Sequence, residues 1–415
     1  MVFRMKKVDI SVLTLYLKDV CMELKKNRFS DHIMIEMKKH LIIIINTVMI
    51  SLLLLGVRVY AGSAAAGNKQ TDNKDTKVTI VMVGDVLMHD RVINSGLQRD
   101  GSYDYSGLFE HVKGEIEAAD IAIVNQETIL GGEKLRYTGY PSFNSPQEVG
   151  DAEVNAGFDV ILHGTNHALD RSAKGIENCL DFWDTAYPDI YVLGIHDSSK
   201  DQQELCVFKC KGIKIAILNY TYGTNGIQMP KGKGYLVDYL SEKKVREDIA
   251  RAEREADITI VCPHWGTEYS LSVSSEQRKW TEIFSECGAD IVIGTHPHVI
   301  EPIERIEDDK GHEMPVYYSL GNFVNATSGS GKGVMNRMVG GMAEITIEPV
   351  KKGNGYNIDA EIKPVICHLT EDEATAYFLE DYTEELAGDN IIRRQDPDFS
   401  LKNCRELVRR VWGNV

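Results

Sequence analysis

The sequence is poor in positive charge. Its 415 residues include 46 Lys/Arg and 62 Asp/Glu, a formal net charge of −16, which argues against a general nucleic-acid-binding protein. Internal repeats of roughly 20–50 residues are also lacking, which argues against solenoids and propellers. Apolar residues make up 43% and charged residues 26%, and only one long hydrophobic run is present. This composition excludes a disordered chain, a collagen and a transporter with several spans.

Cysteine and phosphate-loop motifs are absent as well. Eight cysteines occur, without a CxxC pair or zinc-ribbon spacing, and the seven that follow the hydrophobic run cannot all pair within one chain. We predict no disulfide and interpret most of them as small buried apolar residues.

The segment SGSGKG, residues 328–333, lacks the earlier glycine and the following Ser/Thr of a Walker A loop. We interpret it as a loop near the site, from which Lys332 could meet an anionic substrate.

The hydrophobic run covers residues 41–57 and follows Lys38 and Lys39. Its 17 residues lie between a signal-peptide core of about 7–15 residues and a spanning helix of about 20. Val59-Tyr60-Ala61 resembles a signal-peptidase site in its first and third residues. We predict that residues 41–61 are a signal peptide or membrane anchor, against the alternative of a buried core helix.

Charge on either side of the run predicts its orientation. Residues 1–40 contain nine Lys/Arg and five Asp/Glu, so they carry +4 and the remainder −20. Positive charge stays on the cytoplasmic side of a membrane, so we expect a basic cytoplasmic segment over 1–40. Residues 62–77 are small and polar, and they predict a flexible linker. The acidic remainder is then extracellular, either held at the cell membrane or secreted after cleavage.

From Val78 onward, short Val/Ile-rich runs alternate with helical patterns. The predicted buried strands cover residues 77–85, 120–127, 158–167, 189–195, 212–220, 257–266, 290–298 and 315–323. Ser241 can cap a helix that carries Val245 and Ile249 on one face, and Ser274 or Ser275 can cap another. The alternation predicts an α/β layered domain.

The pattern changes near the C-terminus. Residues 341–350 and 357–369 alternate as a strand pair around a KKGNG turn. Acidic segments at 371–386 and 401–412 have helical character. We therefore divide this part of the chain into a domain over residues 78–370 and a C-terminal helical segment over 371–415.

Polar residues that can bind metals recur where the predicted strands end. The set is Asp85, Asn125, Glu127, Asn166, His167, His264, Glu268, His296, His298 and Asn322. Ligands of open α/β sheets bind at the carboxyl edge of the strands, so five strands deliver these side chains to one rim. Each residue alone has an ordinary explanation, such as a helix cap at Asp85. Together they favour a metal site over a polar cleft without metal.

The histidine pair His296 and His298 is the most specific signal. In a strand-like segment, residues two apart point to the same side, so both imidazoles can face one ion. Imidazole together with carboxylate and amide oxygens suits zinc, manganese or iron better than calcium. We expect one or two divalent ions of this kind.

These motifs resemble the bacterial capsule-synthesis (CapA) family, the poly-γ-glutamate capsule proteins, which is similar to calcineurin-like metallophosphoesterases in motif order. The matching segments are Gly84-Asp85, Asn125-x-Glu127, Asn166-His167, His264-Trp265-Gly266, Gly294-Thr295-His296-Pro297-His298 and Ser319–Phe323. The resemblance runs from about Val78 to Asn325. It implies a layered β-sandwich flanked by helices.

The resemblance also implies roles for individual residues. Asp85, Glu127, Asn166, His264, His296 and His298 would hold the metal. His167 would be the general acid, and Asp170, one helical turn later, would orient it. The phosphoesterase pattern has a histidine two residues after the first aspartate, whereas here the nearest is His89, four residues on. A Gly-Asp-x-x-Asp motif is replaced by Asn125-Gln126-Glu127.

The resemblance implies a protein of capsule or poly-γ-glutamate biosynthesis or export that acts hydrolytically on a cell-envelope substrate. The alternative is a polymer-binding component of an export complex without turnover. The expected partners are an anionic cell-envelope polymer, the membrane and capsule-synthesis membrane proteins, with no nucleic acid. An acidic domain that handles a polyanion needs local positive charge, for which Arg136, Lys231, Lys233 and Lys332 are candidates.

Overall fold

A computed structural model describes residues 76–308, 311–350 and 355–413. The predicted cytoplasmic segment, the signal peptide or anchor, and nearly all of the predicted linker lie outside these residues. Within the described residues, no helix is both long and apolar enough to cross a membrane.

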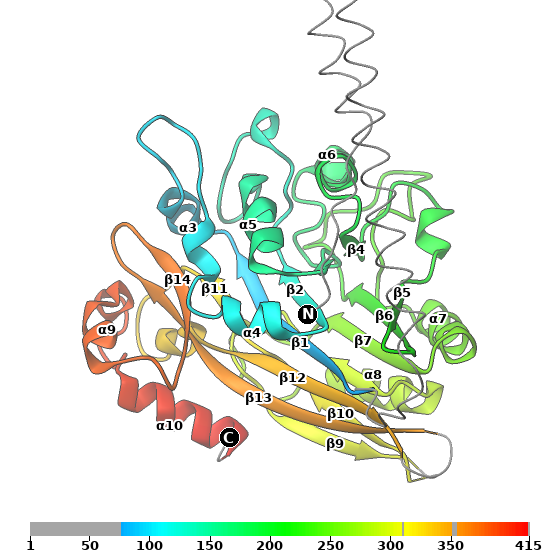
Figure 1. The fold of residues 1–415 in the computed structure, drawn as a ribbon. Coiled ribbons are helices and arrows are strands. Elements are labelled where there is room, and N and C mark those ends of the chain that lie inside the picture. The colour runs from blue at the N-terminus through cyan, green and yellow to red at the C-terminus, as the bar shows by residue number, and fades with distance from the viewer. Residues whose placement is uncertain (1–75, 309–310, 351–354, 414–415) are drawn as a thin grey trace, which may run out of the picture. The chain divides into compact units, whose positions relative to one another are not determined.

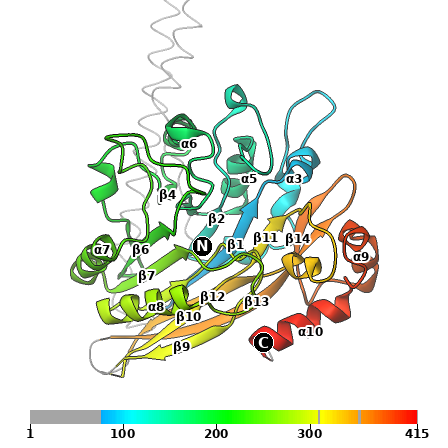
Figure 2. The ribbon, with the colours of Figure 1, turned by 180° about the vertical axis from the view of Figure 1, so that it is seen from behind.

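The described chain forms two β-sheets that face each other (Figures 1 and 2). The first sheet has the order β14 (Ala374–Phe378), β13 (Tyr356–Leu369), β12 (Val339–Pro349), β1 (Val78–Leu87), β2 (Ile121–Gln126), β3 (Val160–Leu162) and β4 (Tyr191–Leu193), and β11 (Asn322–Asn325) also pairs with β1. The second has the order β5 (Val207–Cys210), β6 (Ile213–Thr221), β7 (Ile258–His264), β8 (Ile291–Ile293), β10 (Glu313–Tyr317) and β9 (Ile303–Glu307).

Helices cover the outer faces of both sheets. The α-helices are α3 (Asp90–Ser95), α4 (Lys113–Ala118), α5 (Glu148–Ala156), α6 (Ser172–Ala186), α7 (Glu242–Glu255), α8 (Ser275–Cys287), α9 (Glu384–Asp389) and α10 (Leu401–Trp412). Short 3₁₀ helices are η1 (Ser106–Phe109), η2 (Glu133–Leu135), η3 (Asp201–Gln203), η4 (Val334–Met338) and η5 (Ile391–Arg394). In Figure 1, α7 and α8 lie along the second sheet, and α9 and α10 lie beside β13 and β14.

Alternation along the strands explains this layering. In β1, Ile80 and Met82 face the second sheet, whereas Val81 and Val83 face the helices on the other side. The inter-sheet core is completed by residues such as Ile260 of β7, and a third apolar cluster packs α7 and α8 against the outer face of the second sheet. Two buried faces per strand require continuous Val/Ile runs. The predicted α/β class, a layered β-sandwich flanked by helices, is confirmed.

Local predictions are confirmed for the two helices of the second sheet. Ser274 begins α8 with a capping box, in which its hydroxyl accepts from the Gln277 amide and the Gln277 side chain accepts from the Ser274 amide. Ser241 begins α7, although its side chain makes no capping hydrogen bond, and Val245 and Ile249 are buried as predicted. The seven described cysteines are free.

The predicted secondary structure is wrong at residues 315–323 and 371–386. Residues 315–323 form no single strand: β10 belongs to the second sheet and β11 to the first, because the chain turns at Gly321, whose φ is 67°. The segment 371–386 is not continuously helical, since its residues 374–378 form β14 against β13. Pairing with an open sheet edge outweighs the weak helical pattern there. The predicted helix at 401–412 is present as α10.

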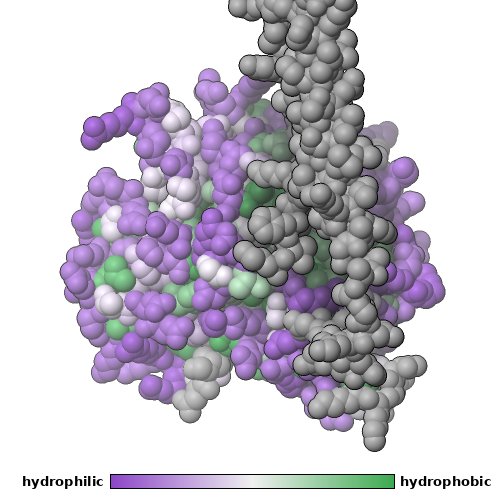
Figure 3. Space-filling model, in the orientation of Figure 1, coloured by the Kyte–Doolittle hydropathy of each residue, from purple (hydrophilic) through white to green (hydrophobic). Residues whose placement is uncertain are grey.

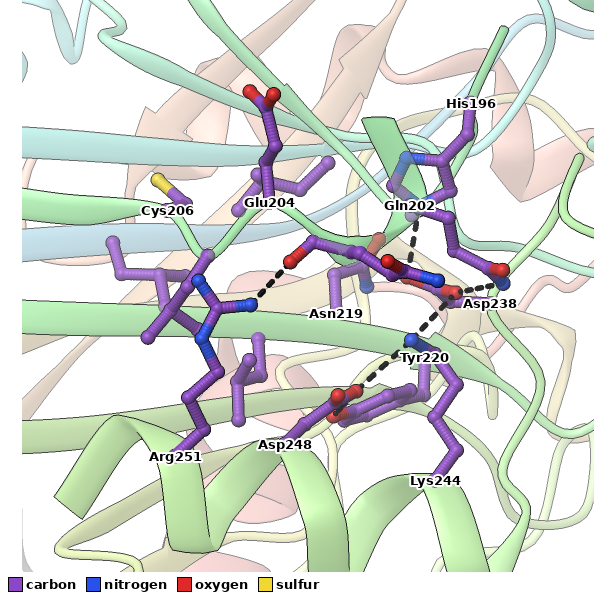
Figure 4. A pocket seen from close by; sticks show the side chains of 16 residues that line it. His196, Gln202, Glu204, Cys206, Asn219, Tyr220, Asp238, Lys244, Asp248 and Arg251 are labelled. Atoms are coloured by element: carbon purple, nitrogen blue, oxygen red, sulfur yellow. Dashed lines mark hydrogen bonds and ion pairs between the residues drawn. The ribbon is translucent and has the colours of Figure 1, made fainter. Parts of the chain in front are cut away.

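A small polar cavity of about 40 Å³ lies beside β5, β6 and α7 (Figure 4). His196 bridges two carboxylates there: its Nδ1 lies 3.2 Å from Asp201 Oδ2 and its Nε2 lies 2.9 Å from Asp238 Oδ2. Asp238 also accepts from Gln202 and pairs with Lys244. The hydrogen bonds and ion pairs of these side chains contribute to stability rather than to an open site.

This network predicts a pH-dependent stability. Burial opposes protonation of His196, but the hydrogen bonds to Asp201 and Asp238 outweigh it and raise its pKa to about 9. Because the unfolded value is about 6.5, the stabilisation is complete below about pH 6.5 and is lost as pH rises through about 9. In urea unfolding, the free energy of unfolding of wild type should fall over this interval by about 1–2 kcal/mol more than that of His196→Gln. This figure allows for the exposure of Asp201. Parallel pH profiles for the two proteins would contradict the assignment.

Candidate metal centre

The predicted ligands meet at the carboxyl ends of strands from both sheets. Asp85 lies near the end of β1, Glu127 follows β2, and His264 ends β7. Asn166 follows β3, and His296 and His298 follow β8. All six are buried, with exposures between 0% and 4%. The strand-end rule therefore places them in one region although they are spread over more than half of the sequence.

Three groups of side chains are close enough to share an ion. One consists of Glu127, His264 and His296, a second of Asp85, Glu127 and His298, and a third of Glu268, His296 and His298, with ligand atoms within 4.8 Å of one another in each. Glu127 belongs to two of these groups. If both groups held an ion, Glu127 would be a ligand that they share.

Glu127 is at the centre of the cluster. Its Oε1 lies 3.6 Å from His298 Nε2, 3.7 Å from His264 Nε2 and 4.0 Å from His167 Nε2. Neither of its carboxylate oxygens has a hydrogen-bond partner among the described residues, although both are buried. Burial opposes ionisation of Glu127, but His298 and His264 outweigh it and hold the pKa of its carboxyl below the usual range.

The second carboxylate is held more firmly. Asp85 Oδ1 accepts from Asn125 Nδ2 at 2.8 Å, and Asp85 Oδ2 lies 3.1 Å from His298 Nδ1. Burial and then the charge of Glu127 raise the pKa of Asp85 above its usual value. Two carboxylates that are buried this close together cost free energy unless cationic groups lie beside them.

The histidines are oriented by oxygens. His264 Nε2 lies 2.8 Å from Asn166 Oδ1, and its Nδ1 lies 3.0 Å from Thr295 Oγ1. His298 Nδ1 lies 3.1 Å from Asn322 Oδ1. His296 Nδ1 is buried without a hydrogen-bond partner in the described chain. Burial, followed by the charges of His264 and His298, lowers the pKa of His296 well below its usual value.

The expected strand-like geometry of His296 and His298 is wrong. Both residues follow the end of β8 and have left-handed backbones, with φ of 100° and 59°. Their side chains converge because of this strained turn rather than by alternation along a strand. Such strain at non-glycine residues is typical of functional sites.

The predicted acid pair is close to the cluster. His167 Nδ1 lies 2.7 Å from Asp170 Oδ2, and the His167 ring packs edge-on against Phe143 at 4.6 Å. Asp170 also accepts from the Phe143 amide at 2.7 Å, which fixes its carboxylate. His167 is 6% exposed, so its Nε2 lies in the buried cluster beside Glu127.

His89 takes no part in the three groups. It precedes α3 and packs against Phe143 at 5.2 Å, and burial, then His298, lowers its pKa to about 4. Glu268 is exposed but does belong to one of the groups.

Three rim residues escaped the sequence prediction. Asn225 joins the two residues of the Asn-His motif: its Oδ1 accepts from Asn166 Nδ2 at 3.2 Å, and its Nδ2 lies 3.4 Å from His167 Nδ1. Tyr222 packs against His296 at 4.7 Å and Tyr269 against His298 at 6.0 Å between ring centroids, and each is 47% exposed. All three follow β6 or β7, so the strand-end rule could have found them.

The four proposed positive charges differ in their surroundings. Lys233 is ion-paired with Glu177 at 2.9 Å. Lys332 lines a hollow of about 380 Å³ with Asn403, Glu406 and Arg410 near α10. Arg136 and Lys231 are exposed. The face of the molecule in Figure 3 is mainly hydrophilic with small, separate hydrophobic areas.

The donor set fits a divalent cation. It offers two buried carboxylates, three imidazoles and an amide oxygen, together with orphaned polar atoms on Glu127 and His296. These are ligands of transition metals. The site therefore has the composition of a divalent metal centre, while the role of each residue as a ligand stays a prediction.

Comparison with known proteins supports the resemblance that the motifs indicate. The family model described as bacterial capsule synthesis protein PGA_cap matches residues 79–327, which include all the predicted site residues. The PGA biosynthesis protein CapA of Bacillus subtilis is 27% identical over 367 residues, 83% of this chain and 90% of that protein. The capsule biosynthesis protein CapA of Bacillus anthracis is 27% identical over 316 residues, 72% of this chain and 73% of that protein.

Solved structures that are similar to this chain include nucleotidases. They include the NAD nucleotidase of Haemophilus influenzae, with a TM-score of 0.42 and 15% identity over 80% of this chain and 66% of that one. The 5'-nucleotidase of Candida albicans has a TM-score of 0.41 and 12% identity over 83% of this chain and 59% of that one.

Proposed function

The chain belongs to the bacterial capsule synthesis protein PGA_cap family, and from this premise we propose that it is a metal-dependent hydrolase that acts on an anionic cell-envelope polymer, such as poly-γ-glutamate, during capsule synthesis or export. The observation that carries the proposal is the meeting of two metal-binding groups at Glu127 beside the His167–Asp170 pair. A site built only for binding needs no buried acid–base pair next to its metal ligands.

The metal and the protein would divide the chemistry. Asp85, Glu127, Asn166, His264, His296 and His298 would hold one or two ions, which supply Lewis acidity and lower the pKa of water. His167 Nε2 faces the cluster and would give a proton to the leaving group. The Asp170 carboxylate, 2.7 Å from His167 Nδ1, would fix the orientation of the ring. Asn225 and Phe143 would limit rotation of the same imidazole.

The N-terminal sequence supports an extracellular location for the proposed reaction. The basic start and the hydrophobic run at residues 41–57 support export of the acidic domain, either with a membrane tether or after cleavage. Its partners would then be the polymer and membrane proteins of capsule synthesis. A net charge of −20 after residue 40 disfavours a general electrostatic attraction of the polymer, which leaves the metal centre and local cations to receive it.

Activity assays test the proposal directly. The purified full-length chain, loaded separately with Mn, Fe or Zn, should hydrolyse model phosphodiesters or γ-glutamyl polymers, and chelation should remove the activity. The family's name favours the γ-glutamyl substrate, whereas the donor set suits either. Binding of the polymer without turnover under all three metals would instead support a binding component of an export complex.

A further inference from the structure

Arg337 of η4 presents a fixed guanidinium at the edge of the metal centre. Its Cζ lies 3.6 Å from the ring centroid of Tyr269, a close cation–π contact. Its Nη1 donates to Thr327 Oγ1 at 2.6 Å. Within the described residues, no carboxylate lies within ion-pair distance of Arg337. The charge is therefore positioned by neutral groups and is free to meet an anion.

A second arginine shows what a structural role looks like in this fold. Arg278 of α8 also lies over a tyrosine ring, Tyr318, at 5.7 Å. Both of its terminal nitrogens, however, bond to the carboxylate of Glu304 at 3.2 Å. Since the domain is rich in acidic residues, an arginine held in place without such a partner is the less expected arrangement.

Hydrogen bonds connect Arg337 and Tyr269 to the metal-binding segment. The Arg337 carbonyl accepts from Asn322 Nδ2 at 2.9 Å, and Asn322 Oδ1 lies 3.1 Å from His298 Nδ1. The Tyr269 amide donates to the Pro297 carbonyl at 2.7 Å, between the two histidines. Tyr269 is nevertheless 47% exposed. The arginine thus lies at the open side of the cluster rather than in the core.

The segment that carries Arg337 is braced by the C-terminal part of the chain. Gln395 Nε2 donates to the carbonyls of Thr327 and Gly329, and Asp396 Oδ2 accepts from the amides of Gly333 and Met335, both at 2.9 Å. Asp396 is 1% exposed. This bracing reduces the entropy that the loop would lose on binding a ligand.

We propose that Arg337, held against Tyr269, forms a subsite that receives a carboxylate or phosphate group of the substrate next to the metal centre. The planar guanidinium can bond to two oxygens of either group at once, and its stacking on Tyr269 fixes the plane. The inference rests on the proposed function for the identity of the substrate and adds the class of group that is recognised. It also explains how an acidic domain can hold a polyanion without a basic surface.

Equilibrium binding with two probes tests the subsite. Short γ-linked glutamate oligomers and inorganic phosphate are titrated into the full-length protein, both metal-loaded and metal-free. Arg337→Ala should weaken one or both probes about 10–100-fold, the value of lost hydrogen bonds to a charged group. A loss of affinity for the oligomer alone shows that the subsite recognises a carboxylate. A loss of affinity for phosphate alone shows that it recognises a phosphate. Arg337→Lys keeps the charge but not the planar guanidinium that can bond to two oxygens, so it should give an intermediate loss of affinity.

The control is Arg278→Ala, which removes an equally charged residue near a tyrosine and should leave both affinities unchanged. Metal content should be the same in all variants. If Arg337→Ala folds poorly, Arg337→Lys decides the matter. The proposal is overturned if the Arg337 variants bind both probes like wild type, or if wild type binds neither. Weakened binding in a protein without turnover would refute the hydrolase and retain the anion subsite.

Discussion

Replacing both His296 and His298 by alanine should remove nearly all of the divalent metal that the protein retains through purification. Each of the three groups of potential ligands contains at least one of these residues. The double variant therefore leaves no complete group. Loss of a residue that only supports a ligand already costs about 10–100-fold in affinity, so loss of two ligands should exceed that range. Metal content per chain, measured by mass spectrometry, is the readout.

Thermal unfolding provides a second readout of the same change. A ligand that binds only the folded state stabilises it in proportion to the logarithm of its concentration over the dissociation constant. Chelation should therefore lower the melting temperature of wild type and leave that of the double variant unchanged. Without the His298 imidazole, which lies 3.1 Å from Asp85 Oδ2 and 3.6 Å from Glu127 Oε1, the two buried carboxylates would lose a partner, so the variant should also be less stable than metal-free wild type.

A histidine pair outside the site is the matched control. His111 stacks on Tyr377 at 3.9 Å and His312 pairs with Asp290 at 3.1 Å, and neither belongs to the groups that could hold an ion. Replacing these two by alanine removes the same number of imidazoles and should leave the metal content unchanged. A wild-type protein without metal, or a His296/His298 variant with the full amount, would refute the metal centre.

The layered fold could be predicted because its central strands, such as β1, β2 and β7, are buried on two faces. Ile80, Val81, Met82 and Val83 of β1 all lie in cores, alternately on one side and the other, and such strands show as continuous Val/Ile runs. The strand order, and the way in which the two sheets face each other, could not be predicted from such runs. They depend on pairings such as β1 with β12, more than 250 residues apart, which no local pattern contains.

The cluster could be predicted because its residues follow strands. The strand-end rule needs only the order of elements, and Asp85, Glu127 and His264 obey it. The way in which His296 and His298 converge could not be predicted, since left-handed backbones at two histidines depend on the surrounding packing. β11 was missed for a related reason: Gly321 redirects the chain to the other sheet within a single apolar run.

The neighbours of the cluster were harder to predict. Arg337 follows the last motif by 14 positions and comes to the site only through its contacts with Tyr269 and Asn322. Nothing in the sequence around Arg337 distinguishes it from a surface arginine. The positive charges chosen from sequence, such as Lys233, had no such contacts. A site that recognises an anion is therefore better predicted from which positive side chains lack a carboxylate partner than from the number of positive residues.

Replacing His167 by alanine should lower kcat by about 10²–10⁴-fold, the usual contribution of a general acid, while metal content and substrate binding stay close to wild type. His167 Nε2 lies 4.0 Å from Glu127 Oε1, and its Nδ1 is bonded to Asp170. Its Nε2 is thus placed to give a proton toward the cluster, while Asp170 holds the ring from the other side. Asp170→Asn should give a smaller loss and shift the pH profile, since it acts through His167.

The dependence on the leaving group distinguishes an acid from a residue that only maintains the structure. A nitrophenolate departs without a proton, whereas an alkoxide or amine needs one. The His167→Ala loss should therefore nearly vanish for a nitrophenyl substrate and be largest for an alkyl or amide one. His89→Ala is the matched control, because His89 packs on the same Phe143 ring but belongs to none of the three groups that could hold an ion; whatever small loss it causes should be equal for both substrates. Equal losses with His167→Ala would assign His167 to positioning and leave the metal centre without its proposed acid.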